Sequence, residues 1–234
     1  MKPAVKNKKK IEVTPSSNGT SGRKSEITRE TILSAARKVF ATHTYNSASL
    51  RMIATAGSFD HAIIRYYFPN KAVLFETVLT DACDKFYNAN LRCLEGLEKA
   101  NTSKGFSLYI DRVIDQSFEI QDVLKLFIQN ITHIDTPESI PGYKHIPEVI
   151  EKIRTSFEKN IPIKAPAEEV GMFVYGFVNL LINYLGANNC MSHLLNMDHE
   201  SKRYRKWVKD SLMFLFLPRL KRLIFADQYS EKSK

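Results

Sequence analysis

Apolar residues recur with the spacing of an α-helix along most of this chain, and no other feature constrains the fold as strongly. One such stripe consists of Ile32, Leu33, Ala36, Val39 and Phe40, and the neighbouring charged residues fall outside it. No stretch alternates between apolar and polar residues for long enough to predict a β-strand. The sequence therefore predicts an all-α fold of about nine helices in total.

The first four predicted helices have recognisable ends. Thr28, Asp60 and Asn70 suit N-caps because their side chains accept hydrogen bonds from free backbone N–H groups, and Pro69 should stop a helix because it has no N–H. The predicted helices are residues 28 to about 40, 49 to about 57, 61 to about 67 and 71 to about 98. Two short helices behind a longer one form a helix-turn-helix, whose last helix fits a DNA major groove about 12 Å wide.

The rest of the chain is also predicted to be helical, with prolines at several of the joins. Pro218 should end or kink the last helix. The predicted helices are residues 103–117, 119–134, 146–160, 165–185 and 201–225.

The positive charge is concentrated at the beginning of the chain. The formal net charge is +9; residues 1–24 carry six excess positive charges and residues 25–71 carry three, whereas the remaining 163 residues hold 21 of each sign. This distribution is typical of a protein with one end that meets a polyanion. Residues 1–24 are rich in Lys, Ser and Gly, and we expect a flexible basic arm that either contacts phosphates or keeps the chain soluble.

Cysteine usage and hydrophobicity indicate a reducing, aqueous environment. Three widely spaced cysteines are not a disulfide framework, and the lysine-rich start has no apolar core of a signal peptide. The longest apolar stretch, residues 173–187, is interrupted by two asparagines and is shorter than the roughly 20 residues of a membrane span. We expect a cytoplasmic protein that does not enter the membrane.

A set of residues between Thr28 and Leu79 has a distinctive spacing. The set comprises Ile32, Ala35, Ala36, Phe40, Tyr45, Ile53, Ala54, the run from Ile64 to Phe68, and Lys71. With this spacing the segment closely resembles the N-terminal DNA-binding domain of the TetR/AcrR family of bacterial transcription regulators. The resemblance implies a DNA-binding domain at residues 25–71 and a ligand-binding and dimerisation domain at residues 72–234.

The resemblance also implies roles for individual residues. His61, Ala62 and Ile63 stand where the family reads base edges in double-stranded DNA. The positions at which the family contacts backbone phosphates are Arg65, Tyr66, Tyr67, Lys71 and, on the preceding helix, Arg51. These side chains suit the role because cations neutralise phosphates and phenol hydroxyls donate to them.

Several positions depart from the family pattern. Thr44 stands where a glycine is usual and would be strained by roughly 1 kcal/mol at positive φ. Ala48 replaces the usual capping threonine, so Ser47 or Ser49 should cap the second helix. Asp60 places a carboxylate near the groove. These departures keep the fold prediction and leave the operator sequence open.

The last two long helices are expected to form the homodimer interface, because the corresponding family helices meet their two-fold mates. An alternative is that their apolar stripes simply face the core of one protomer. The predicted interface residues are Phe173, Phe177, Leu181, Tyr184, Trp207, Ser211, Leu212 and Leu215.

The family keeps an effector pocket between these helices and the fourth helix. A mostly apolar cavity with a few polar groups would suit a hydrophobic or amphipathic small molecule, although for any single aromatic residue core packing is the more common role. The predicted lining residues are Phe86, Tyr109, Phe127, Asn130, His133 and Phe177.

No pattern in the sequence predicts catalysis, a cofactor or a metal. Cys190, His193 and His199 lack the partners of a zinc motif, and no nucleophile elbow or phosphate-binding loop is present. We expect a ligand-responsive regulator, foremost a repressor, that binds a palindromic operator as a homodimer. The alternatives are a sequence-neutral architectural DNA-binding protein and an all-α lipid-binding protein or enzyme with a basic end.

Overall fold

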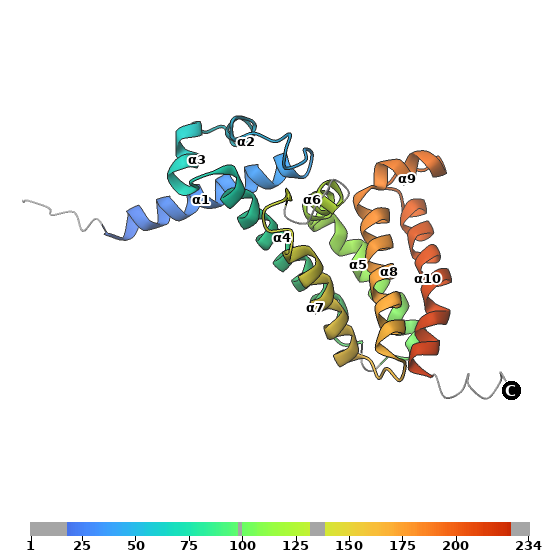
Figure 1. Cartoon of the computed structure of the whole chain (residues 1–234). Helices are drawn as coiled ribbons and strands as arrows, with labels where there is room; N and C mark the ends of the chain where they lie inside the picture. Colours follow the sequence, from blue (N-terminus) through green and yellow to red (C-terminus); the bar gives the residue numbers. More distant parts are fainter. Residues whose placement is uncertain (1–17, 98–99, 132–138, 226–234) are drawn as a thin grey trace, which may run out of the picture.

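The protein is all-α (Figure 1). The computed structural model describes residues 18–97, 100–131 and 139–225, and these residues form helices joined by turns without any strand. The helices are α1 (Asn18–Phe40), α2 (Leu50–Gly57), α3 (His61–Tyr67), α4 (Lys71–Leu94), α5 (Thr102–Glu119), α6 (Gln121–Ile131), α7 (His145–Asn160), α8 (Ala167–Gly186), α9 (Asn188–Leu195) and α10 (Lys202–Ile224).

Nine of these ten helices correspond to the predicted ones, and α9 is additional. The sequence gives little sign of α9, because the helix is short and no side chain caps its first turn. It ends at Asn196, which adopts a left-handed conformation with φ +51°. A short helix thus lies in the connection between α8 and α10, for which no helix was predicted.

Helix α1 starts earlier than predicted. It begins at Asn18, so Thr28 lies inside the helix and is not its N-cap. Residues 18–24, predicted to belong to the flexible arm, are part of α1, and residues 1–17 of that arm lie outside the described residues.

The first three helices and the start of α4 enclose a small apolar core. Ile53, Ile64 and Phe68 belong to it, and all three side chains are buried. Phe40 and Phe75 pack edge to face with their ring centroids 4.8 Å apart, which fixes α4 against α1. We call residues 28–70 the head and residues 72–225 the body.

Helix α4 runs from the head into the body (Figure 1). Near the head it packs on α1, where Arg37 forms an ion pair with Asp81. Further along it packs against α5, α6 and α7. One continuous helix therefore connects the two parts of the molecule.

Helix α8 lies in the middle of the body, in contact with α5, α6, α7, α9 and α10. By length and composition alone it would be able to cross a membrane, but 56% of its apolar window is buried against the other helices. A core helix passes the same test, so this is weak evidence for a span.

Helix α10 is marked by the aromatic contacts of Trp207 and by an internal proline, Pro218. Trp207 packs edge-on against Tyr184 of α8 and lies over Tyr204, with ring centroids 5.1 and 6.3 Å away. Pro218 does not end the helix, which continues to Ile224. Its exposed position allows this, because the carbonyl group that loses its N–H partner belongs to Phe214 and lies on the solvent side.

Candidate nucleic-acid interface and effector cavity

The tight turn between α2 and α3 sets the geometry of the head. Ser49 caps α2 by accepting a hydrogen bond from the N–H of Met52, as one of the two alternatives for this cap predicted. Asp60 caps α3, with its Oδ1 2.6 Å from the backbone nitrogen of Ala62. Both caps position α3 across the end of α2.

The backbone strain in this region lies at Ser58 rather than at Thr44. Among the described residues, the non-glycine positions with positive φ are Ser58 and Asn196, so the strain expected at Thr44 is absent. Ser58 ends α2 with φ +56°, and its N–H bonds back to the last turn of the helix. The chain therefore uses a serine where a left-handed C-cap favours glycine.

The predicted base-reading residues differ in exposure. Ala62 is exposed at the start of α3, and His61 is half-buried beside it. Ile63 is also half-buried, but it packs against the core of the head. The free face at the start of α3 is therefore formed by His61 and Ala62 more than by Ile63.

Three of the predicted phosphate-binding side chains lie on the surface. Arg51 and Arg65 are exposed, and neither has an acidic partner among the described residues. Tyr66 is 82% exposed, and Tyr67 packs edge-on against it at 5.0 Å and partly against the core. A shallow hollow between α2 and α3 is lined in part by Arg51 and His61, so these two side chains border the same surface.

Lys71, one of the predicted phosphate contacts, lies at the start of α4 and contacts the connection between α1 and α2. Its ammonium group donates to the backbone oxygens of Tyr45 and Ala48, at 2.8 and 3.1 Å, and lies 4.4 Å from the centroid of the Tyr45 ring. Burial lowers the pKa of this ammonium group. Lys71 thus fastens the α1–α2 connection to α4 through two backbone acceptors, and the residue is half-buried.

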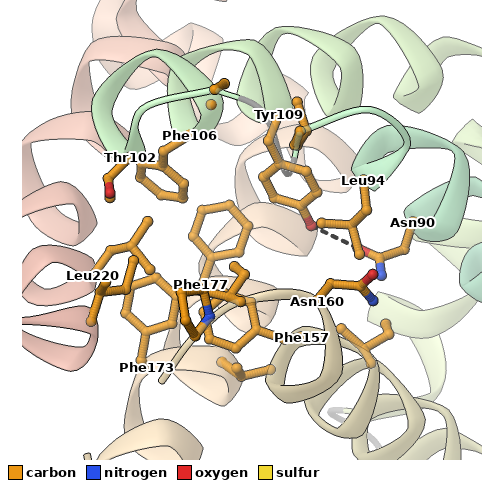
Figure 2. Close-up of a pocket in the computed structure, with 18 of the residues that line it drawn as sticks. Asn90, Leu94, Thr102, Phe106, Tyr109, Phe157, Asn160, Phe173, Phe177 and Leu220 are labelled. Atoms are coloured by element: carbon orange, nitrogen blue, oxygen red, sulfur yellow. Dashed lines mark hydrogen bonds between the residues drawn. The ribbon is translucent and has the colours of Figure 1, made fainter. Parts of the chain in front are cut away.

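A cavity of about 390 Å³ lies in the body, at the end farther from the head (Figure 2). Helices α4, α5, α7, α8 and α10 all contribute to its walls. Its lining includes Asn90, Leu94, Thr102, Phe106, Tyr109, Ile153, Phe157, Asn160, Phe173, Val174, Phe177, Leu220 and Phe225.

The structure places the predicted cavity residues in different surroundings. Tyr109 and Phe177 line the cavity, and Phe86 lines a smaller pocket next to it. Phe127 instead packs edge-on against Phe86, with centroids 5.3 Å apart, in the core. Asn130 is fully buried and donates to the backbone oxygen of Leu126; neither Phe127 nor Asn130 lines the 390 Å³ cavity or the smaller pocket.

His133, the remaining predicted lining residue, lies outside the described residues. Asn90, Phe157 and Asn160 line the cavity without having been predicted. They lie at helix ends that meet only in three dimensions, and spacing along the chain does not reveal such a meeting.

The predicted dimer residues also divide into two groups. Phe173, Phe177, Leu181 and Leu212 are buried within the single protomer, which favours the core alternative for these four. Tyr184, Trp207 and Ser211 are half-buried, and Leu215 is 46% exposed. Other apolar side chains lie free on α8 and α10, among them Met172 and Phe214, which are 66% and 80% exposed.

Residues 32–78 match the family model of the bacterial regulatory proteins of the tetR family. This segment contains the whole turn between α2 and α3 and the start of α4. The chain belongs to the TetR family. Its head is therefore the DNA-binding helix-turn-helix of a TetR-family transcription regulator.

Solved structures share the fold of this TetR-family chain at low sequence identity. A tetR-family transcriptional regulator from Streptomyces coelicolor is 17% identical, with a TM-score of 0.58 over 86% of this chain and 90% of that one. The fatty acid degradation regulator FadR from Bacillus halodurans is 13% identical, with a TM-score of 0.55 over 85% and 95%. AibR, solved with isovaleryl coenzyme A and operator DNA, is 14% identical, with a TM-score of 0.55 over 81% and 98%. A search among curated protein sequences finds no match.

The described part of the TetR-family chain contains no group of three or more His, Cys, Asp or Glu side chains able to hold a metal ion. Cys190 and His193 are both exposed on α9. The described residues thus give no support to a metal site around Cys190.

Proposed function

We propose that this TetR-family protein is a homodimeric repressor that binds a palindromic operator and leaves it when a small molecule enters the body cavity. The observation that carries the proposal is the course of α4. Lys71 at its start is bonded to the head, and Asn90 and Leu94 near its end line the cavity. One rigid element thus touches both sites.

The length of α4 makes the coupling mechanical. A helix of 24 residues is about 36 Å long. If α4 tilts as a rigid rod, a small displacement of its cavity end is accompanied by a displacement of similar size at its head end. Two recognition helices must lie roughly 34 to 36 Å apart to enter consecutive major grooves. A ligand that prefers one tilt of α4 would therefore shift the equilibrium between DNA-binding and released states.

The face proposed to contact DNA is the exposed side of α2 and α3. Arg51, Arg65 and Tyr66 supply phosphate contacts, while His61 and Ala62 face the bases. Arg51 and Arg65 have no acidic partner among the described residues, so their charge is available to an anion. Lys71 is left out of this set because its ammonium group already has two acceptors.

The pairing surface of the homodimer is proposed to be the outer face of α8 and α10. Met172, Tyr175 and Gly176 are exposed along α8, and Phe214 and Leu215 are exposed on α10. The two helices pack against each other, and we propose that these exposed residues together form the pairing surface. A two-fold axis through it would present two heads to one palindrome.

The AibR structure with isovaleryl coenzyme A and operator DNA supports the combination of ligand and DNA binding in this fold. The direct test is selection of duplexes from a random pool by the purified protein. We expect enrichment of an inverted repeat whose half-sites are about one helical turn apart. Equal binding of selected and random duplexes would refute the proposal and favour an architectural role.

Repression is tested separately in a reporter strain. The selected site is placed downstream of a promoter, and the protein should lower transcription. The double variant Arg51→Met/Arg65→Met, which alters two exposed side chains, should not lower it. An increase in transcription with the unmodified protein would overturn the repressor assignment.

A further inference from the structure

The described lining of the body cavity contains polar side chains but no charged ones. None of its described lining residues carries a formal charge, and the polar ones are amides, a hydroxyl and a phenol. Glu98 and Lys99, between Leu97 and Ala100, lie outside the described residues. A buried carboxylate or phosphate without a paired cation loses its hydration at high cost. The described walls therefore favour an uncharged ligand.

The walls also favour a flat ligand. Phe173 and Phe177 are stacked, with their planes 9° apart, and Phe157 stacks on Phe173 with centroids 5.3 Å apart. Phe106 approaches Phe177 at 5.7 Å from the facing helix, and Figure 2 shows these rings around one space. Aromatic groups pack well against such faces and edges. A planar apolar molecule would make the most contact.

One side chain on this wall lacks a hydrogen-bond partner. The Oδ1 of Asn90 accepts from the Tyr109 hydroxyl at 2.6 Å, whereas its Nδ2 is buried and has no partner (Figure 2). Burial raises the pKa of the Tyr109 phenol, so the phenol keeps its proton and remains a donor. In this orientation the Tyr109 hydroxyl donates to Oδ1, which leaves the amide N–H groups without an acceptor. An unpaired N–H donor is therefore held at the wall.

We propose that the cavity binds an uncharged, planar and largely apolar molecule whose carbonyl or similar oxygen accepts a hydrogen bond from Asn90 Nδ2. This inference rests on the proposed function only in treating that molecule as the effector; the binding preference stands on the cavity itself. The amide N–H of Asn160 already donates to the Ser156 oxygen at 2.7 Å. Asn160 is thus a polar lining residue whose amide N–H already has an acceptor, and it provides a matched control.

The test uses three naphthalenes of nearly equal size: 2-acetylnaphthalene, 2-ethylnaphthalene and 2-naphthoate. Each competes with the neutral fluorescent ketone Prodan for the full-length protein at pH 7.5. The ketone should bind about 2- to 10-fold more tightly than the ethyl compound, as one neutral hydrogen bond implies, and the carboxylate should bind most weakly. Failure of Prodan and the ketone to bind would overturn the proposal, as would tightest binding by the carboxylate.

Variants then locate the hydrogen bond. Asn90→Leu should reduce the ratio of ketone to ethyl affinity to about one, whereas Asn160→Leu should preserve it. A preserved ratio in Asn90→Leu would overturn the assignment. If Asn90→Leu does not fold, the infrared carbonyl band of 2-acetylnaphthalene bound to the unmodified protein decides. A band at lower wavenumber than in hexane supports the bond, and an unshifted band refutes it.

The operator assay distinguishes this proposal from the proposed function. Binding of the ketone without any change in operator affinity would count against the ligand-responsive mechanism and leave the cavity preference standing. Lys99→Met should leave the ranking of the three compounds unchanged. A carboxylate that binds most tightly and loses this affinity in Lys99→Met would identify a charged effector and refute the uncharged one.

Discussion

The contacts of Lys71 predict that its replacement by methionine lowers the melting temperature of the protein. They also predict that the replacement changes the salt dependence of DNA binding little. Methionine keeps an unbranched apolar side chain and removes the ammonium group. The change therefore leaves the oxygens of Tyr45 and Ala48 without their donor and removes the contact with the Tyr45 ring. Both oxygens belong to the connection between α1 and α2, so the loosened part is the helix-turn-helix support.

The size of the effect follows from opposing contributions. A hydrogen bond to a charged group contributes about 1.5–3 kcal/mol, and a partly exposed cation–π contact contributes about 0.5–1 kcal/mol. The lowered pKa of Lys71 shows that lost hydration offsets part of this gain. We therefore expect a net loss of about 1–2 kcal/mol, or about 3–6 °C in melting temperature for a chain of this length.

Thermal denaturation followed by circular dichroism measures the first quantity, and fluorescence anisotropy of labelled operator over a range of salt concentrations measures the second. The matched control is Arg65→Met, which alters an exposed cation on α3. This control should keep the melting temperature and lower the salt slope by about one. An unchanged melting temperature for Lys71→Met, together with a slope lowered as in the control, would refute the structural role and restore the phosphate contact.

Other predictions concern the turn, the pairing surface and the thiols. Ser58→Gly should raise stability by about 0.5–1 kcal/mol because it relieves left-handed strain, and a lower melting temperature would contradict this. Phe214→Asp should convert the dimer to a monomer in analytical ultracentrifugation, since the side chain is 80% exposed on the proposed surface; an intact dimer would exclude Phe214 from the interface. Cys190 should react with Ellman's reagent in the folded protein at pH 8. Burial raises the pKa of Cys83 to about 12 and of Cys93 to about 11, so rapid reaction of all three would contradict their burial.

Local chemistry explains why much of the head was predictable. Asp60 and Asn70 cap α3 and α4 as their side chains and positions predicted. The start of α1 was missed because residues 18–27 include two glycines and three serines or threonines, and such residues disfavour helix interiors. A helix end can be predicted from the sequence when a single capping residue determines it, and less well when packing determines it.

The body was predictable as helices but not as surfaces. An apolar stripe has the same spacing whether it faces the core or a second subunit, so Leu212 and Leu215 looked alike in sequence. The structure buries the former completely and leaves the latter half exposed. In the same way, the sequence does not distinguish Asn90 from other polar residues. Only the structure shows that the Tyr109 hydroxyl donates to its Oδ1 and that its Nδ2 has no partner.

The placement of Trp207 gives this chain a built-in optical probe. It is the only tryptophan in the sequence, and it lies in the body between Tyr184 and Tyr204. Indole emission therefore follows only the melting of the body, whereas helical ellipticity follows the whole molecule. Heating the protein while both are recorded would show whether the head opens first, as ellipticity falling before the emission changes. The two curves would separate the cooperative melting of the head from that of the body without any added label.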